Sequence, residues 1–225
     1  LSSLRHYESD RFMELDLTAR RNLELTETLR GGEKKGSLLW VLDKTKTAMG
    51  SRMIRSWIEQ PLISPAAIRR RLDGVQALVE HTMEREELIL ALREVTDLER
   101  IIGRVVYGSA NARDLASLAA GLGKIPKLRE LCAAVDAPLI AEVRQGLDDL
   151  TALREELERA IVDEPPFTVR EGGMIRTGYN EEVDRLHSIQ TGGRDLVAQM
   201  EARVKEECGI RNLKVSYNKV FGYYI

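Results

Sequence analysis

The residues best suited to contact a ligand gather near the end of the sequence, where lysine, asparagine and tyrosine alternate. Lys214, Asn218 and Lys219 supply ammonium and amide donors of the kind that contact DNA phosphates without reading the bases. Tyr217 and Tyr223 stand beside them. By composition alone, aromatic packing with solvated lysines is the simpler interpretation. A DNA contact at Lys214, Asn218 and Lys219 therefore depends on where the rest of the chain places this stretch.

Residues of catalytic or metal-binding type also occur elsewhere. The loop 31–37 is rich in glycine and lysine but lacks the spacing of a phosphate-binding loop, so it is interpreted as a surface loop. Asp184 and His187 stand one helical turn apart, and without a third metal ligand a surface contact is the preferred interpretation. Glu171 has acidic neighbours but no nearby histidine. The sequence therefore predicts no catalytic residue, metal site or cofactor in this chain.

Composition limits the class of protein. Of the 225 residues, 43% are apolar and 31% are charged, with a formal net charge of −2, so any contact with nucleic acid must be local. No apolar run approaches the roughly 18 residues that span a bilayer, and no signal pattern opens the chain. Cys132 and Cys208 are far apart and lack ligand neighbours. These features predict a reduced, cytoplasmic setting and no membrane partner.

A long helix is predicted from Asn180 to Cys208. Asn180 is a suitable N-cap, acidic residues fill the first turn, and Gly209 stands at the C-cap position. At a rise of about 1.5 Å per residue the helix spans roughly 40 Å and reaches beyond the body that holds its base. One narrow apolar seam follows it, formed by Val183, Leu186, Val197, Met200 and Val204.

Gly192 and Gly193 interrupt this helix, each at a cost of about 1 kcal/mol relative to alanine. A kink or a close helix crossing is the preferred interpretation, and a true break is the alternative. The pair is the candidate hinge. Beyond Gly209 the apolar spacing becomes alternating and turn residues follow Tyr217, which predicts a β-hairpin.

The stretch between Ser37 and Ile161 is predicted to form a body of short amphipathic helices. Capping residues, or proline in the first turn, mark their starts at Ser37, Thr47, Ser64, Asp97, Asn111 and Pro138. Glycine and proline between 121 and 126 are expected to kink or split one helix. In the helix that follows Ser64, the predicted buried stripe consists of Ile68, Leu72, Val75, Leu78 and Val79.

The expected fold is mainly α: a multi-helix bundle with one long protruding lever helix and a small β-hairpin at the C-terminus. The expected domains are a helical core over 1–163, a connecting segment with the long helix over 164–209, and strands over 210–225. A small hairpin or an extended loop is expected over 167–178. Because the chain starts without methionine and stops within a strand pattern, it is expected to be a piece of a larger protein.

Four strings carry the most distinctive patterns of the sequence: LDLTARRNLELTETLRGG, LLWVLDKTKTAMGSRMIRSWIEQPL, VREGGMIRTGYNEEVDRL and LKVSYNKVFGYYI. In this order they resemble segments of the bacterial MutS family of DNA mismatch-recognition proteins, and the resemblance covers essentially the whole chain. It implies the helical core region, also called the lever domain. The long helix would run toward a DNA clamp, and the hairpin after Arg211 would be the clamp's first strands.

The resemblance also implies functions that no residue of this chain performs. In the family a mismatch-reading domain lies upstream, and an ATPase that uses ATP and magnesium lies downstream; neither motif occurs here. The longer protein is expected to bind mismatched double-stranded DNA, to form a homodimer and to act with mismatch repair partner proteins. This fragment would couple the ATPase to the clamp without a catalytic site of its own. The alternative is a helical scaffold for protein–protein interaction.

Overall fold

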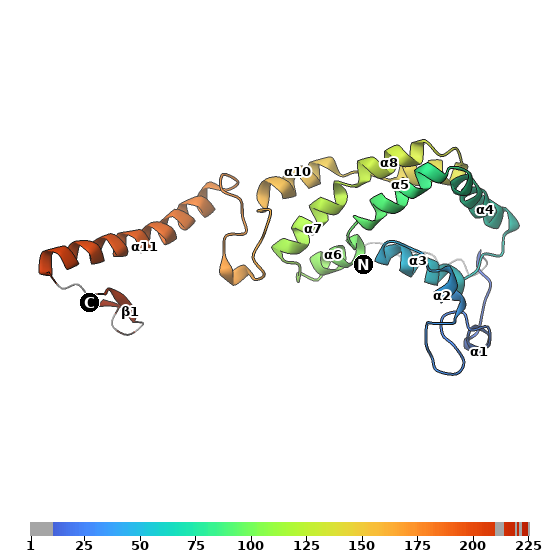
Figure 1. The fold of residues 1–225 in the computed structure, drawn as a ribbon, viewed down its shortest axis with the longest axis horizontal. Helices are drawn as coiled ribbons and strands as arrows, with labels where there is room; N and C mark the ends of the chain where they lie inside the picture. The colour runs from blue at the N-terminus through green and yellow to red at the C-terminus, as the bar shows by residue number, and fades with distance from the viewer. Residues whose placement is uncertain (1–10, 210–213, 219, 221, 225) are drawn as a thin grey trace. The chain divides into compact units, whose positions relative to one another are not determined.

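The structure is a computed structural model that describes residues 11–209, 214–218, 220 and 222–224 (Figure 1). At positions 190, 191, 193–196, 218 and 223 it describes the backbone alone. Helices dominate, with a short pair of strands near the C-terminus, which confirms the mainly α fold. Contacts divide the chain into two units, Leu1–Gly172 and Gly173–Ile225. The domain limits predicted after 163 and 209 stay predictions.

The helices of the first unit follow one another with short connections. They are α1 (Leu17–Asn22), α2 (Leu38–Leu42), α3 (Ala48–Glu59), α4 (Pro65–Glu80), α5 (Thr82–Arg93), α6 (Leu98–Val106), α7 (Ala112–Leu122), α8 (Ile125–Ala133), α9 (Pro138–Gly146), α10 (Thr151–Ala160) and the 3-10 turn η2 (Val169–Glu171). The predicted caps are confirmed, since a backbone amide donates to the side chain of Ser37, Thr47, Ser64, Asp97 and Asn111. Each such cap stabilises its helix by about 1 kcal/mol.

A buried cluster joins α6, α7 and α8. It consists of Ile101, Leu118, Leu122 and Ile125, with Leu98, Leu147 and Leu157 packed against it. A Cβ at Gly121 of α7 would lie 2.6 Å from Thr96 Oγ1 and 2.9 Å from Leu98 Cδ2. Glycine at this position therefore lets the segment before α6 approach the backbone of α7.

The buried face of α4 differs from the predicted one. Leu72, Val75 and Val79 are 59%, 58% and 54% exposed, and Ile68 is exposed as well. Of the predicted stripe, Leu78 alone packs against a buried cluster. The prediction of a buried stripe along these larger residues is therefore wrong.

Small residues form the buried face of α4 because α9 comes close to its backbone. Gly74 and Ala77 are the buried residues of the helix. A Cβ at Gly74 would lie 3.1 Å from Leu139 Cδ2 of α9, so a larger residue does not fit without movement. Ala77 continues this face in a cluster with Val135 and Ala137.

Charged side chains fasten the N-terminal helices. Asp43, which follows α2, accepts hydrogen bonds from Lys34 Nζ and Thr45 Oγ1 at 2.6 Å and from Ser51 Oγ at 2.8 Å. These bonds, that of Lys34 above all, hold the pKa of Asp43 well below its ordinary value. The loop before α2 is thereby tied to the first turn of α3.

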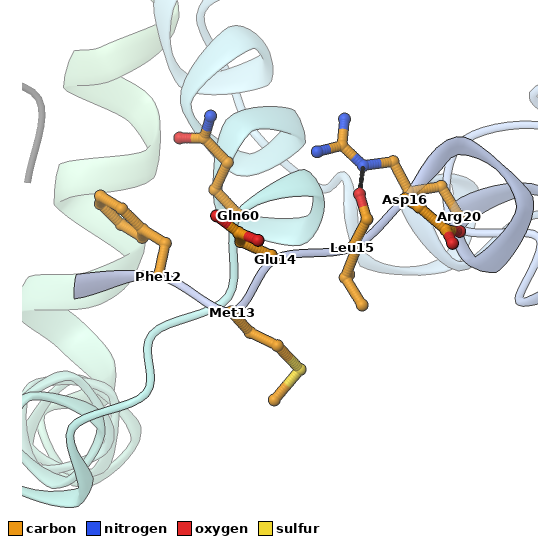
Figure 2. Close-up of a pocket in the computed structure, with 7 residues that line it drawn as sticks. All are labelled: Phe12, Met13, Glu14, Leu15, Asp16, Arg20 and Gln60. Carbon is orange, nitrogen blue, oxygen red and sulfur yellow. Dashed lines mark hydrogen bonds between the residues drawn. The ribbon is translucent and has the colours of Figure 1, made fainter. Parts of the chain in front are cut away.

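A surface pocket of about 490 Å³ lies beside the segment that leads into α1 (Figure 2). Phe12 in this segment pairs with Leu62 in an isolated antiparallel bridge. Arg20 donates from Nε to the carbonyl of Leu15 at 2.9 Å, and Asp16 accepts the Ala19 amide as the N-cap of α1. Polar groups of the pocket thus hold the entry segment in place.

The second unit contains α11 (Glu181–Cys208) and a hairpin of β1 (Ser216–Asn218) and β2 (Gly222–Tyr224). The strands are antiparallel, with Tyr217 opposite Tyr223. Gly209 ends α11 in the left-handed conformation at φ 68°, as its C-cap position predicts. The long helix and the hairpin predicted from the sequence are therefore confirmed.

Candidate nucleic-acid interface and lever helix

The base of α11 is fixed by hydrogen bonds in its first turn. Asn180 Oδ1 accepts from the amides of Glu182 and Val183, both at 3.1 Å, which confirms it as the N-cap. Asp184 accepts the amide of Gly178 at 2.8 Å, so its carboxylate holds the turn that leads into the helix. The acidic first turn also faces the positive end of the helix dipole.

The helix continues through Gly192 without a break. A Cβ at Gly192 would meet no described atom within 4 Å, so no helix among the described residues crosses closely at this position. Val183, Leu186 and Met200 of the predicted seam are exposed. The flexure predicted at Gly192 and Gly193 stays a prediction.

The predicted DNA-contacting residues lie at and around the hairpin. Lys214 is exposed just before β1, and Asn218 is the last residue of that strand. Lys219 lies outside the described residues. Tyr217, between them, is exposed. The structure therefore presents Lys214 to solvent, and the phosphate contacts of Lys214, Asn218 and Lys219 stay predictions.

Glu201 joins the helix to the segment that enters the hairpin. Its Oε1 accepts from Lys205 Nζ at 2.6 Å, and its Oε2 accepts from the Val215 amide at 3.1 Å. The bond from Lys205, and then the Val215 amide, hold the pKa of Glu201 below its ordinary value, with the positive charges of Lys205 and Lys214 adding to the effect. The Glu201 carboxylate thus binds both a side chain of α11 and the backbone of the segment that enters the hairpin.

Arg113 of α7 holds the segment that follows α10. Its Nε donates to the carbonyl of Pro165 at 2.8 Å, and its guanidinium lies 3.4 Å from the ring centre of Phe167. Thr168 and Glu171 then form a capping box around η2. A 3-10 turn is therefore described at this place, where a small hairpin was one of the two sequence expectations.

Sequence reasoning missed the roles of Glu201 and Arg113. The spacing of Glu201 and Lys205 was a usable signal, because residues four apart on a helix are neighbours. The Val215 amide and the Pro165 carbonyl gave no signal, since every residue carries the same backbone groups. Contacts between a side chain and a distant backbone group require the fold to be known.

The two cysteines are free thiols, Cys132 buried and Cys208 exposed. Burial raises the pKa of the Cys132 thiol. Across the described ranges, no group of three or more His, Cys, Asp or Glu side chains is placed to hold a metal ion. No helix among the described residues is long and apolar enough to cross a membrane. The cytoplasmic setting stays a prediction.

Comparison with known proteins decides the family. The model of MutS domain III matches residues 18–215 of the chain. This chain belongs to the MutS domain III family. It is 48% identical over 222 residues to the DNA mismatch repair protein MutS of Brevibacillus brevis, and 50% identical over 219 residues to that of Acetivibrio thermocellus.

These MutS relatives are much longer than the matched region. The alignments cover 99% and 97% of this chain but only 26% and 25% of the two relatives, so the chain spans about a quarter of their length. The family match runs from α1 through α11 to the residue before β1. Family membership confirms the MutS resemblance drawn from the sequence.

Proposed function

We propose that this MutS domain is the helical core and lever of a DNA mismatch repair ATPase. In this proposal α11 transmits conformational changes between an ATPase site, which binds ATP and magnesium, and a DNA clamp. Other parts of the longer protein complete both sites. The observation that carries the proposal is a 28-residue helix that is followed in the chain by a β-hairpin. Because its backbone hydrogen bonds are satisfied internally, such a helix moves as a rod.

Coupling of this kind is reciprocal. If DNA binding at the clamp biases the lever, the lever must bias nucleotide binding by the same free energy. The complete protein would act on mismatched double-stranded DNA as a homodimer with mismatch repair partners. The domain itself supplies positioning and no catalytic group.

The hairpin is the place where this domain would touch DNA. Lys214 is exposed just before β1, Asn218 is the last residue of that strand, and Lys219 follows it in the sequence. Lysine ammonium groups bind phosphates as point charges, and asparagine adds a hydrogen-bond donor. Such contacts do not depend on the base sequence, so this domain would hold DNA without selecting a mismatch.

Fluorescence anisotropy with matched and mismatched duplexes at low and moderate salt tests this role. We expect weak binding that is equal for the two duplexes and falls as salt rises, because it depends on phosphate contacts. Lys214→Ala should weaken binding and reduce the salt dependence, whereas Lys35→Ala, which removes an exposed charge from the other unit, should not. A preference for the mismatched duplex would contradict the proposal.

The second function is a helical scaffold for another protein. The exposed apolar residues Leu72, Val75 and Val79 on α4 favour it, because they form one stripe along the helix. A partner that binds this face should lose affinity on Leu72→Ser or Val79→Ser. If both variants bind such a partner as tightly as wild type does, the scaffold function is contradicted and the lever function remains.

A further inference from the structure

The contact between Glu201 and Val215 spans a reversal of the chain. Glu201 lies in α11, which ends at Cys208, and Val215 stands just before β1. Between Glu201 and Gly209 the helix rises about 12 Å, at roughly 1.5 Å per residue. The entry to the hairpin has therefore returned to a level about two turns back from the end of the helix. The hydrogen bond fixes this return.

We infer that Glu201 is the positioning residue that fastens the hairpin, and with it Lys214, to the end of α11. Its carboxylate divides its two oxygens between Lys205 and the Val215 amide. The Glu201 side chain is 25% exposed, so water competes only in part for these bonds. The Lys205 contact holds the carboxylate in place along the helix, and the second oxygen is then free to receive the amide.

Glutamine cannot replace this carboxylate, although it has nearly the same shape. A carboxylate accepts hydrogen bonds at both oxygens, whereas an amide has one acceptor and one donor. If the amide oxygen of a glutamine accepts from Val215, its NH2 group faces the ammonium of Lys205. If the oxygen accepts from Lys205, the NH2 group faces the Val215 amide. Glu201→Gln must lose one of the two contacts.

Amide hydrogen exchange of Val215 in the 225-residue chain tests the inference without DNA. We expect exchange about tenfold faster in Glu201→Gln and in Glu201→Ala, because the amide loses a charged acceptor. Glu207→Gln is the matched control, since Glu207 lies on the same helix and accepts from Arg203 at 3.0 Å. Equal Val215 exchange in wild type, Glu201→Gln and Glu207→Gln would overturn the inference.

A pH titration tests whether the negative charge of Glu201, and not only its shape, holds the Val215 amide. The charges that face Glu201 are those of Lys205 and Lys214. The chemical shift of the Val215 amide should therefore titrate with a midpoint below the ordinary glutamate pKa, and Glu201→Gln should abolish this step. A Val215 shift that does not follow the titration of Glu201 would also overturn the inference.

The role of Glu201 in DNA contact rests on the proposed function. If the wild-type chain binds DNA in the anisotropy experiment, Glu201→Gln should bind several-fold more weakly than Glu207→Gln, because Lys214 is no longer held in place. Equal DNA affinity of the two variants would contradict the positioning of Lys214. Absence of DNA binding in wild type, with Val215 exchange changed as expected, would contradict the proposed function and support the anchor.

Discussion

Asp43 is the residue on which the N-terminal loops converge. Its side chain is only 10% exposed and accepts hydrogen bonds from Lys34, Thr45 and Ser51. Hydrogen bonds to a carboxylate stabilise its charged form, which lowers the pKa. The folded state therefore takes up a proton at Asp43 less readily than the unfolded chain does.

This difference predicts how stability depends on pH. The contribution of Asp43 is fully present above its unfolded pKa of about 3.8 and is lost as the pH falls toward the lower folded value. Asp43→Asn should lower the free energy of unfolding near neutral pH by about 1–2 kcal/mol and reduce its decline in acid. Urea unfolding at about pH 7 and about pH 3 measures both effects.

Asp73→Asn is the control for this prediction, because it neutralises an exposed carboxylate on α4. As a substitution of an exposed residue, it should change the free energy of unfolding by no more than about 0.5 kcal/mol. If Asp43→Asn and Asp73→Asn behave alike, the hydrogen bonds to Asp43 do not contribute as described.

Packing between elements depends on single glycines. At Gly121 of α7 an added Cβ would clash with Thr96 and Leu98, whereas at Gly103 of α6 it would meet no described atom within 4 Å. Both glycines lie within helices, where alanine is intrinsically preferred. The two sites therefore separate helix propensity from packing.

Gly121→Ala should lower the free energy of unfolding by about 1–3 kcal/mol, because the helix must shift to relieve the clash. Gly103→Ala should be neutral or stabilising by up to about 1 kcal/mol. Urea unfolding curves of the two variants test the pair. A stability of Gly121→Ala equal to that of Gly103→Ala would mean that the close approach to Thr96 is not maintained in solution.

At the scale of elements, helix ends were far easier to predict than helix faces. Ser37, Thr47 and Asn180 were recognised as N-caps because a cap is a local signal, read within one turn. The buried face of α4 depends instead on α9, more than sixty residues later in the chain. An apolar stripe on α4 indicated a buried face, but contact with Leu139 selected the small residues Gly74 and Ala77.

Prediction of the site residues likewise succeeded for local signals and failed for contacts between distant residues. The hairpin beside Lys214 was predicted because the alternating pattern and its turn residues are local, although Asn218, expected in the turn, is the last residue of β1. Their contact with DNA remains a prediction, since it involves a second molecule. Glu201 was missed because its partner is a backbone amide brought back by the chain reversal after α11.

At the scale of the whole molecule, the apolar stripe of α4 gives this domain a surface suited to contact. Leu72, Val75 and Val79 remain exposed in the first unit. The longer MutS relatives contain about three quarters of their length outside the matched region. Surfaces left open on one domain of a longer chain are the natural places for its other parts to pack.

Polar substitution of the stripe should therefore cost this chain little. We expect Leu72→Ser and Val79→Ser to change the free energy of unfolding by no more than about 0.5 kcal/mol, as for surface residues. Leu118→Ala, in the buried cluster, should cost about 2–5 kcal/mol. Thermal or urea unfolding distinguishes them. Losses at Leu72 as large as at Leu118 would show that α4 is covered in solution.

The order of the helices also bears on how this domain forms during synthesis. Neighbours in sequence pack together, as α2 does with α3, α4 with α5, α6 with α7 and α8 with α9. Contacts of this kind close short loops and form quickly, so each pair can associate soon after it leaves the ribosome. The packing of α7 against α10 can form only later, because α10 is synthesised after α7, α8 and α9. Until α10 has been made, the part of the α7 surface that it covers therefore stays exposed to solvent.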